Sequence, residues 1–506
     1  MSAESKTKPS STPRIRVGFL SLVQCIFVVV IFFAVNFLSS QHHRPFDISD
    51  DLGFTLAEST QRYLGSEAIT GREDPIRMIV AFRADSPFYE RIRPVAEEYV
   101  RLSGRKIRLI LIDPIRANDQ AESIAAEYNL IFNQDLVIID ARTAEERQKS
   151  QVKQASPHVH ISRLEDMVAY ETDANNQRRV RAFLGEDALR AGLVNAIEGK
   201  PRRMWILADK SDLGSDAGKD VWPVLSSNLA SQNILPERVA LAGKDSIPEE
   251  VDSIAIIGAR YDLSPEELRL IENYWGRPRA SILVTTGASE VPPRLRAFLR
   301  SQGVTPRSDR VLAEKKEQIT TRVVAHFTEG MELTRDLWEK STMFEGVTRS
   351  LEVREGAEDL LNQRVAPFSL LEADSSYWGE TSFPADSVLF DEDEDQPGPL
   401  SLAAAVIKGT ATDERFANDT GRMIVISNSA FLEADRARQT NLDFLASATN
   451  WLVGRDDLTG EAPRNLRIYR LPLLPAQVTF INRANLIVIP AALLLIGLMT
   501  WAGRRA

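Results

Sequence analysis

The chain has 506 residues, of which 43% are apolar and 26% charged, and it carries a formal net charge of −10. This composition is typical of a globular protein with about two to four domains, and it excludes a disordered or collagen-like chain. The acidic balance argues against a whole-chain nucleic-acid binder. One cysteine and five histidines exclude an intrachain disulfide, a CxxC redox pair and zinc sites of four cysteines or of two cysteines with two histidines.

Two uncharged runs near the ends of the chain predict membrane spans. Residues 17–38 contain 22 consecutive uncharged residues and residues 484–502 contain 19, and at about 1.5 Å per residue each run can cross a bilayer as a helix. The first run exceeds the roughly 7–15 apolar residues of a signal peptide, so we expect it to stay uncleaved. Cys25 lies inside it, where we expect a small apolar side chain facing lipid or a partner helix and no lipid attachment.

The flanking charges predict the orientation of both spans. Four cationic residues precede the first span and only Arg44 follows it closely, so we expect tails 1–16 and 503–506 in the cytoplasm of a bacterium. Residues 39–483 are then extracytoplasmic. The tails carry +3 and +2, which leaves the extracytoplasmic part near −15. Anionic lipid headgroups repel such a domain, so we expect it to stand away from the inner membrane.

After a linker at 39–74, residues 75–195 predict a small α/β domain. Strands are expected at 76–83, 106–113 and 135–140, with helices at 88–102 and 121–128 between them. The simplest pairing of such a series is parallel, through right-handed crossovers. The layout resembles a thioredoxin-like domain. Redox chemistry is excluded, because no cysteine follows the first strand.

Residues 200–460 predict a second α/β domain. Its expected strands lie at 203–208, 253–257, 281–285 and 423–427, and its expected helices at 222–231, 264–274, 293–301 and 441–453. The pattern favours a doubly wound sheet of the flavodoxin-like or glutamine-amidotransferase-like kind, whose ligands would bind at the carboxyl ends of the strands. An irregular insertion is expected at about 305–420. A linker at 461–483 then leads to the second span.

Two loops carry motifs that only partly fit a ligand site. Residues 214–220 (GSDAGKD) are similar to a phosphate loop, but they are one residue short, and Asp220 stands where Ser or Thr would hold magnesium. Asp391, Asp393 and Asp395 alternate as at the start of an EF-hand, yet Gln396 replaces the required glycine. We therefore expect solvated loops at both places.

Three further residues, two histidines and a serine, are candidates for metal binding or catalysis. His158 and His160 would share one face of a strand and could ligate a metal, but two histidines without placed carboxylates are more often a surface pair. Ser289 follows a strand, but no residue near it in the sequence can be identified as its general base. An amidotransferase needs a nucleophilic cysteine at the turn between a strand and a helix, and this chain has no cysteine there. We therefore expect no catalytic, metal-binding or cofactor-binding residue.

Taken in order, short motifs along the chain resemble the GldG-like family, which comprises auxiliary components of gliding-motility-associated ABC-type transport systems. The resemblance covers about 45–500 and includes one anchor at each end and the helix-strand unit at 266–286. At 275–278 the chain has WGRP where the family usually has a Gly-Gly turn. The short motifs are FDIS at 46–49, FTL at 54–56, IDP at 112–114, YWGET at 377–381, GPL at 398–400, GRMIV at 421–425, AFL at 430–432 and the segment 441–454.

This resemblance implies a non-catalytic, membrane-anchored auxiliary subunit that docks on separate permease and ATPase subunits and needs no cofactor. An alternative is an extracytoplasmic receptor that binds a small ligand at the strand ends around Ala208, Gly258 and Thr286. A degenerate hydrolase is a weaker alternative. The transported substrate and the oligomeric state do not follow from the sequence.

Overall fold

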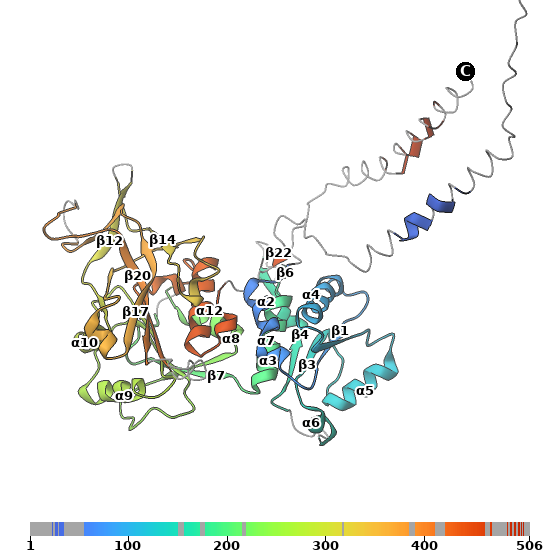
Figure 1. Cartoon of the computed structure of the whole chain (residues 1–506), viewed down its shortest axis with the longest axis horizontal. Coiled ribbons are helices and arrows are strands. Elements are labelled where there is room, and N and C mark those ends of the chain that lie inside the picture. Colours follow the sequence, from blue (N-terminus) through green and yellow to red (C-terminus); the bar gives the residue numbers. More distant parts are fainter. Residues whose placement is uncertain are drawn as a thin grey trace, which may run out of the picture. The chain divides into compact units, whose positions relative to one another are not determined.

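The structure is a computed structural model, and apart from short stretches of the termini it describes residues 55–149, 156–172, 178–214, 219–315, 318–383, 390–409 and 420–460. The chain divides into two compact units, residues 1–55 and 56–506, and all described strands belong to the second (Figure 1). Within the described residues, no helix has the length and hydropathy needed to cross a bilayer. Most of the expected spans at 17–38 and 484–502, with Cys25 and both tails, lie outside the described residues, so the spans stay predictions.

The fold is mixed α/β and contains several sheets, as expected. The first sheet has the strand order β2-β1-β3-β4. Its strands are β1 (Ile76–Ala81), β2 (Ile107–Ile112), β3 (Leu136–Asp140) and β4 (Val159–Arg163). Its helices are α4 (Tyr89–Leu102), α5 (Asn118–Tyr128), α6 (Ala144–Lys149) and α7 (Gly185–Glu198).

The expectation of all-parallel pairing in this sheet is wrong at the third strand. β1 and β2 are parallel, but β3 is antiparallel to β1, and β4 is antiparallel to β3. Residues 129–135, which follow α5, lead the chain back to the end of β1, where Leu136 pairs with Ala81, so β3 runs in the opposite direction. There, Asp135 accepts a hydrogen bond from the Arg83 backbone N–H at 3.0 Å.

The largest sheet has eleven strands, and five parallel strands form one side of it, from its edge inward, in the order β8-β7-β9-β10-β21. They are β7 (Arg202–Leu207), β8 (Ile234–Val239), β9 (Ser253–Ala259), β10 (Ser281–Thr286) and β21 (Gly421–Ile426). β8 is not evident from the sequence, because its residues ILPERV alternate poorly and carry a proline. That proline is tolerated because β8 is the edge strand.

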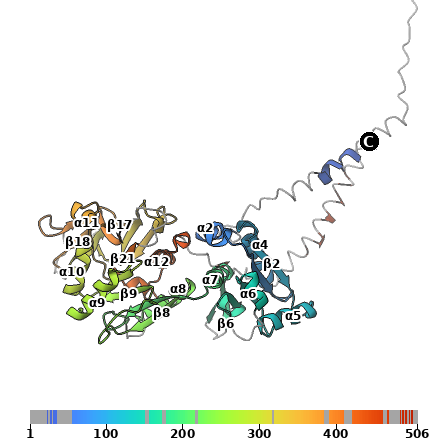
Figure 2. The same cartoon turned by 60° about the horizontal axis from the view of Figure 1, so that its bottom comes forward.

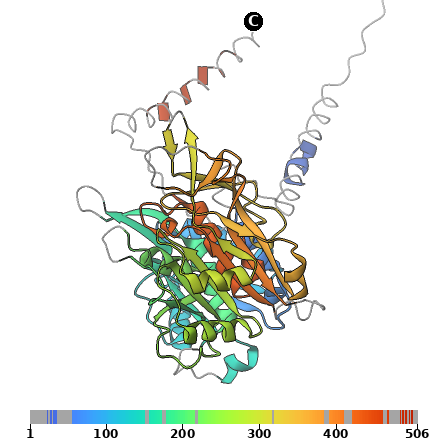
Figure 3. The ribbon, with the colours of Figure 1, turned by 90° about the vertical axis from the view of Figure 1, so that its left-hand side faces the viewer.

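Helices cover both faces of this sheet. They are α8 (Trp222–Ser231), α9 (Pro265–Trp275), α10 (Pro293–Ser301) and α12 (Gln439–Leu452). Figures 1 and 2 show α9 and α10 on one side of the strands and α8 and α12 on the other, and Figure 3 looks onto the face that α9 and α10 cover. Two separate clusters of buried apolar side chains match these two faces. Residues 200–460 therefore bury their central strands on both sides, as near-continuous apolar strands require.

Residues 305–420, expected to be irregular, instead extend the same sheet by antiparallel pairing. The strands concerned are β14 (Val323–Phe327), β15 (Ser341–Phe344), β16 (Leu351–Val353), β17 (Val365–Ala373) and β20 (Leu400–Lys408), and β11 (Val304–Pro306) pairs with β16. The register shifts twice between β17 and β20, at Ser369/Leu371 and Leu371/Glu372. Such bulges break the alternation on which strand prediction depends.

Smaller elements complete the unit. One small sheet joins β12 (Arg310–Lys315), β13 (Gln318–Thr320), β18 (Tyr377–Glu380) and β19 (Gln396–Pro397), and another joins β5 (Val168–Thr172), β6 (Arg178–Phe183) and β22 (Leu466–Arg467). Between residues 55 and 460, the described chain also contains the α-helices α2 (Glu58–Gly65), α3 (Glu67–Thr70) and α11 (Glu358–Asn362). The pairing of β22 with β6 joins the end of the folded unit to residues that precede β7.

Candidate functional site

The carboxyl ends of the parallel strands are tied to one another by hydrogen bonds. The Asp212 N–H, after β7, donates to the Ile257 carbonyl of β9 at 2.8 Å. The Gly258 N–H donates to Thr285 Oγ1 of β10 at 2.8 Å. Ala208, Gly258 and Thr286 therefore belong to one edge, as expected, but Gly258 and Thr286 are buried. These bonds close the edge between β7, β9 and β10.

Gly258 shows how closely the loops approach at this edge. Its φ is +60°, and a Cβ there would lie 3.2 Å from the Asp212 carbonyl oxygen and 3.2 Å from Ser429 Oγ. The neighbouring Gly287 would place a Cβ 3.3 Å from the Gly258 Cα. Only glycine combines this φ with so little space. The loops that follow three strands thus pack directly against each other.

Cavities lie beside this closed edge and elsewhere on the unit. One of about 570 Å³ runs along α10 at the carboxyl ends of β9 and β10. Another, of about 590 Å³, lies at the opposite, amino-terminal edge of the sheet and includes Arg202, Ala280 and Arg422. A third, of about 810 Å³, follows the edge strand β2. Ala208, Gly258 and Thr286 line none of these three cavities.

Of the two predicted histidines, only His160 lies in β4, because His158 occupies the turn that precedes this strand; both rings pack against α7 or its C-terminal end. His158 Nδ1 is 2.9 Å from the Ala196 carbonyl oxygen. A Cβ on Gly192 would lie 2.8 Å from His160 Cδ2, so this glycine provides the space that the ring fills. Burial lowers the pKa of His160. Among the residues that the structure describes, no three or more His, Cys, Asp or Glu side chains lie close enough together to hold a metal ion.

The structure describes Ser289 and the acidic run 391–395, but only part of the loop 214–220. Ser289 is half-buried after β10, and within the described residues no histidine is hydrogen-bonded to it. Of residues 214–220, only 214 and 219–220 are described. In the acidic run the carboxylates cap backbone groups, since Asp395 accepts from the Thr381 N–H at 3.0 Å and from the Asp391 N–H at 2.9 Å.

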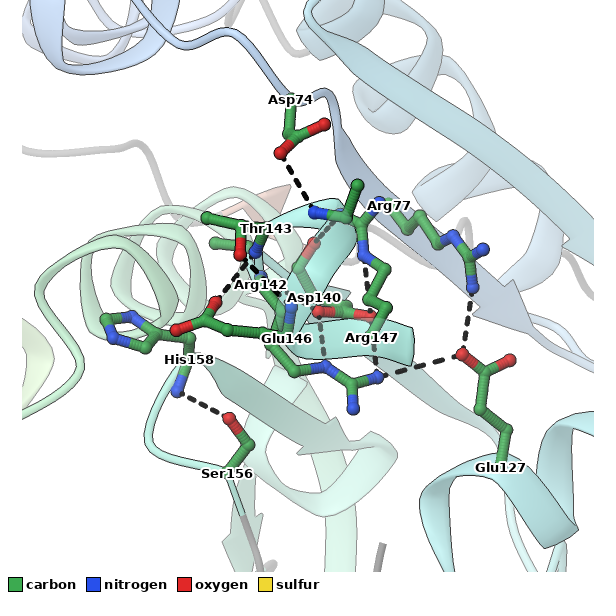
Figure 4. A network of polar contacts seen from close by, with 12 residues as sticks. Asp74, Arg77, Glu127, Asp140, Arg142, Thr143, Glu146, Arg147, Ser156 and His158 are labelled. Atoms are coloured by element: carbon green, nitrogen blue, oxygen red, sulfur yellow. Dashed lines mark hydrogen bonds and ion pairs between the residues drawn. The ribbon is translucent and has the colours of Figure 1, made fainter. Parts of the chain in front are cut away.

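A buried ionic cluster at the end of β3 was not found from the sequence (Figure 4). Asp140 accepts from Arg142 Nε at 2.9 Å, from Arg142 Nη2 at 2.8 Å and from Tyr128 Oη at 2.8 Å. Glu127 lies 3.7 Å from Arg142 and 2.9 Å from Arg77. Burial raises the pKa of Asp140, but the hydrogen bonds from Arg142 outweigh it and hold the pKa below its ordinary value. The cluster is internally compensated, which suits a structural role.

A second buried polar cluster, here called the joint, consists of Glu198, Gln232, Asn450 and Arg455. Arg455 donates to Glu198 through Nε at 2.9 Å and Nη2 at 2.6 Å. Gln232 Oε1 accepts from Asn450 Nδ2 at 2.8 Å. Arg190 also donates to Gln232 Oε1, at 3.0 Å. The joint therefore ties α7 to α12 and to the connection between α8 and β8.

A third contact joins the beginning of the folded unit to its end. Arg62 of α2 forms a bidentate ion pair with Asp336, at 3.0 and 2.8 Å, and also donates to the Thr459 carbonyl. The Asp336 side chain is 5% exposed, so the pair is largely shielded from water. Nothing in the sequence near Arg62 signals this pairing, because its partners lie more than 270 residues away.

Comparisons with known proteins leave the family open. No family model matches the chain, and no curated protein matches it. One solved structure to which the chain is similar is titled "mmIFT52 N-terminal domain", with 11% identity and a TM-score of 0.34, and the match covers 49% of this chain and 96% of that chain. A likeness at that score carries no argument about fold or function.

Proposed function

We propose that this chain is a non-catalytic, membrane-anchored auxiliary subunit of an ABC-type transport system of the gliding-motility-associated kind. It docks on separate permease and ATPase subunits in a bacterial inner membrane, and residues 39–483 lie outside the cytoplasm. The proposal starts from the resemblance to the GldG-like family and from the two expected spans at 17–38 and 484–502.

The observation that carries the proposal is the meeting of the two ends of the folded unit. Arg62, shortly after the expected first span, pairs with Asp336 and with the carbonyl of Thr459, shortly before the expected second span. Glu186 accepts from the Ala57 N–H at 2.9 Å and so fixes the first residues of the unit. Both anchors would therefore leave the folded unit from one region, and a displacement of either would act on the same shielded ion pair.

The strand orders support the finer fold assignment that this proposal includes. The order β2-β1-β3-β4, with β3 and β4 antiparallel, suits a thioredoxin-like domain at 75–195. The order β8-β7-β9-β10-β21 is the second-first-third-fourth-fifth order of a flavodoxin-like doubly wound domain at 200–460.

Crosslinking tests the proposal directly. A photoreactive residue is placed at successive positions of each expected span, and membranes are irradiated without nucleotide and with nucleotide trapped in the ATPase. We expect a product of this chain with a multispan permease from at least one span. Membranes from cells that lack the permease are the control. Absence of a permease product from both spans in both nucleotide states would refute docking.

A further inference from the structure

We propose that the groove along α10 is a binding site for the phosphate group of a small organic ligand. The groove has a volume of about 570 Å³, which lies within the range of ligand sites. Its lining includes Arg260, Arg296, Arg300 and Thr305, from three separate segments of the chain. This site is independent of the proposed docking function.

Two arginines on α10 supply cationic groups that internal ion pairs do not use. Arg296 and Arg300 are four residues apart, so they lie one turn apart on the same helical face. Arg296 donates through Nε to the Pro306 carbonyl at 2.8 Å, which orients its guanidinium and leaves both terminal nitrogens unpaired among the described residues. Both side chains are exposed, and within the described part of the chain Arg300 has no partner.

The third arginine is only weakly engaged. Arg260 follows β9, and its guanidinium lies 3.4 Å from the Asp212 carboxylate. Both side chains of that pair are about half exposed, at 48% and 44%, so water competes with the contact. Arg260 can therefore turn from Asp212 to an anion in the groove with little loss of binding free energy.

The carboxylates that line the groove are already neutralised. Asp262 accepts from the backbone N–H and from Nη1 of Arg294, both at 3.1 Å. Glu290 lies 3.0 Å from Arg349 and accepts from the Ser308 hydroxyl at 3.0 Å. The excess positive charge of Arg260, Arg296 and Arg300 is thus left facing the groove.

Thr305 places an unpaired polar atom next to the groove. The residue is 6% exposed and lines the groove, and its Oγ1 is buried without a hydrogen-bond partner among the described residues. Buried polar atoms nearly always find a partner, but this oxygen is covered by neighbouring protein atoms, so it would reach a ligand in the groove only after a local side-chain movement. The groove also includes Pro293, the first residue of α10, where the helix dipole favours negative charge.

These features fit a phosphate group better than a neutral ligand. Guanidinium groups match phosphate oxygens through paired N–H donors. A threonine hydroxyl can donate to a further oxygen. The remaining volume would hold the organic part of the ligand.

Binding of inorganic phosphate to the full chain in detergent, measured by calorimetry, is the test. We expect Arg300→Gln and Arg296→Gln each to raise Kd by about tenfold or more, and Thr305→Val by a few fold. Arg269→Gln removes an exposed charge from α9, outside the groove, and should change Kd less than twofold. No binding at 10 mM phosphate, or an equal loss in Arg269→Gln, would overturn the site.

A competition experiment identifies the source of the phosphate. Glycerol 3-phosphate that displaces inorganic phosphate from the wild type would support a soluble ligand, provided that Arg300→Gln reduces its binding. Displacement only by phosphatidylglycerol, added as mixed micelles with the same detergent and again lost in Arg300→Gln, would support a lipid headgroup. Displacement by neither would overturn the proposal of an organic phosphate ligand. Crosslinking to the permease is a separate measurement, so docking and phosphate binding can fail independently.

Discussion

At the scale of single residues, Asp140 illustrates how the fold accommodates buried charge. Its side chain is fully buried and meets two guanidinium nitrogens and a phenol. Taking an ion out of water is costly, and a buried pair recovers that cost only when both partners remain. Arg142, whose side chain is 2% exposed, is therefore tied to Asp140 far more strongly than the surface arginines are to their partners.

Removing Arg142 should test this dependence. We expect Arg142→Met to lower the free energy of unfolding by about 3–5 kcal/mol, because it leaves Asp140 buried without its main donor. Urea unfolding of the full chain in detergent measures the change. Arg93→Met is the matched control, because the Arg93–Glu97 pair is 46% and 50% exposed and should contribute less than about 1 kcal/mol. Equal effects of the two substitutions would contradict the structural role of the cluster.

The pH dependence of the same pair has a definite sign. Because the pKa of Asp140 is held below its ordinary value of 3.8, the unfolded chain takes up the proton at a higher pH than the folded chain does. The pair stabilises the fold above that ordinary value, and its contribution is lost as the pH falls through the lower folded pKa. This contribution to stability is therefore lost only in strongly acidic solution.

His160 should act in a milder pH range. Burial lowers its pKa from 6.5, so below that pH the unfolded chain binds a proton that the folded chain resists. Stability should therefore fall as the pH drops from 7.5 to 5.5, by less than about 1.4 kcal/mol per pH unit for one proton. His160→Gln should flatten the change in urea midpoint, whereas His326→Gln, at an exposed position, should leave it unaltered. An unchanged slope in His160→Gln would contradict the lowered pKa.

At the scale of elements, the sequence predicted the apolar strands well. The expected strands at 76–83, 106–113 and 135–140 correspond to β1, β2 and β3, and the expected helix at 222–231 has the bounds of α8. These segments are strongly apolar or clearly periodic. The edge strand β8 and the bulged pair β17–β20 were missed, since polar residues and register shifts remove the periodic signal.

The candidate site was less accessible to sequence reasoning than the strands. In the alternative receptor interpretation a ligand would bind at the carboxyl ends of the strands, but the hydrogen bonds that close this edge depend on contacts between distant loops. The groove depends on Thr305 returning beside α10 through the pairing of β11 with β16. The sequence does contain a local indication of an anion site, because five arginines lie between residues 294 and 310.

The closed strand edge predicts a specific sensitivity at Gly258. We expect Gly258→Ala to destabilise the unit by about 2–4 kcal/mol, because it combines a positive φ with a Cβ 3.2 Å from the Asp212 carbonyl oxygen. Gly356→Ala is the matched control, since its φ is +66° and nothing lies within 4 Å of its added Cβ. Thermal unfolding should show that Gly356→Ala lowers the free energy of unfolding by only about 1 kcal/mol. Similar losses at the two sites would mean that the strand ends are not closely packed.

At the scale of the whole molecule, the joint and the Arg62–Asp336 pair unite segments that are far apart in sequence. The joint fixes α7 to α12, and Arg62 fixes α2 to residues 336 and 459. A unit bound together in this way would transmit a displacement of its ends instead of absorbing it in a flexible connection. This property suits a subunit that responds to a moving permease.

The proposed topology can be tested with reporter fusions. An enzyme that is active only outside the cytoplasm should be active when it is inserted after residue 385 and silent when it is fused after residue 506. The reason is the excess of Lys and Arg before residue 17, which by the positive-inside rule should keep that end in the cytoplasm. A cytoplasmic reporter at the same two positions should give the opposite pattern. Activity only after residue 506 would reverse the orientation.

Replacing the second expected span separates docking from catalysis. An unrelated apolar helix in place of residues 484–502 keeps the length that insertion needs but removes Ala491, Ala492 and Gly497, small residues that allow close helix packing. We expect transport or motility to fall while the protein still accumulates in the membrane.

The matched comparison is a set of substitutions at the three candidate catalytic or metal-binding residues of the sequence. Ser289→Ala, His158→Ala and His160→Ala should leave activity near normal at neutral pH, because the histidines pack against α7 and no histidine within the described residues is bonded to Ser289. Membrane levels of each variant must be measured beside activity, so that loss of protein is not mistaken for loss of function. Normal activity with the replaced span, together with inactivity of Ser289→Ala, would favour a catalytic site at the strand ends and refute docking through the anchor.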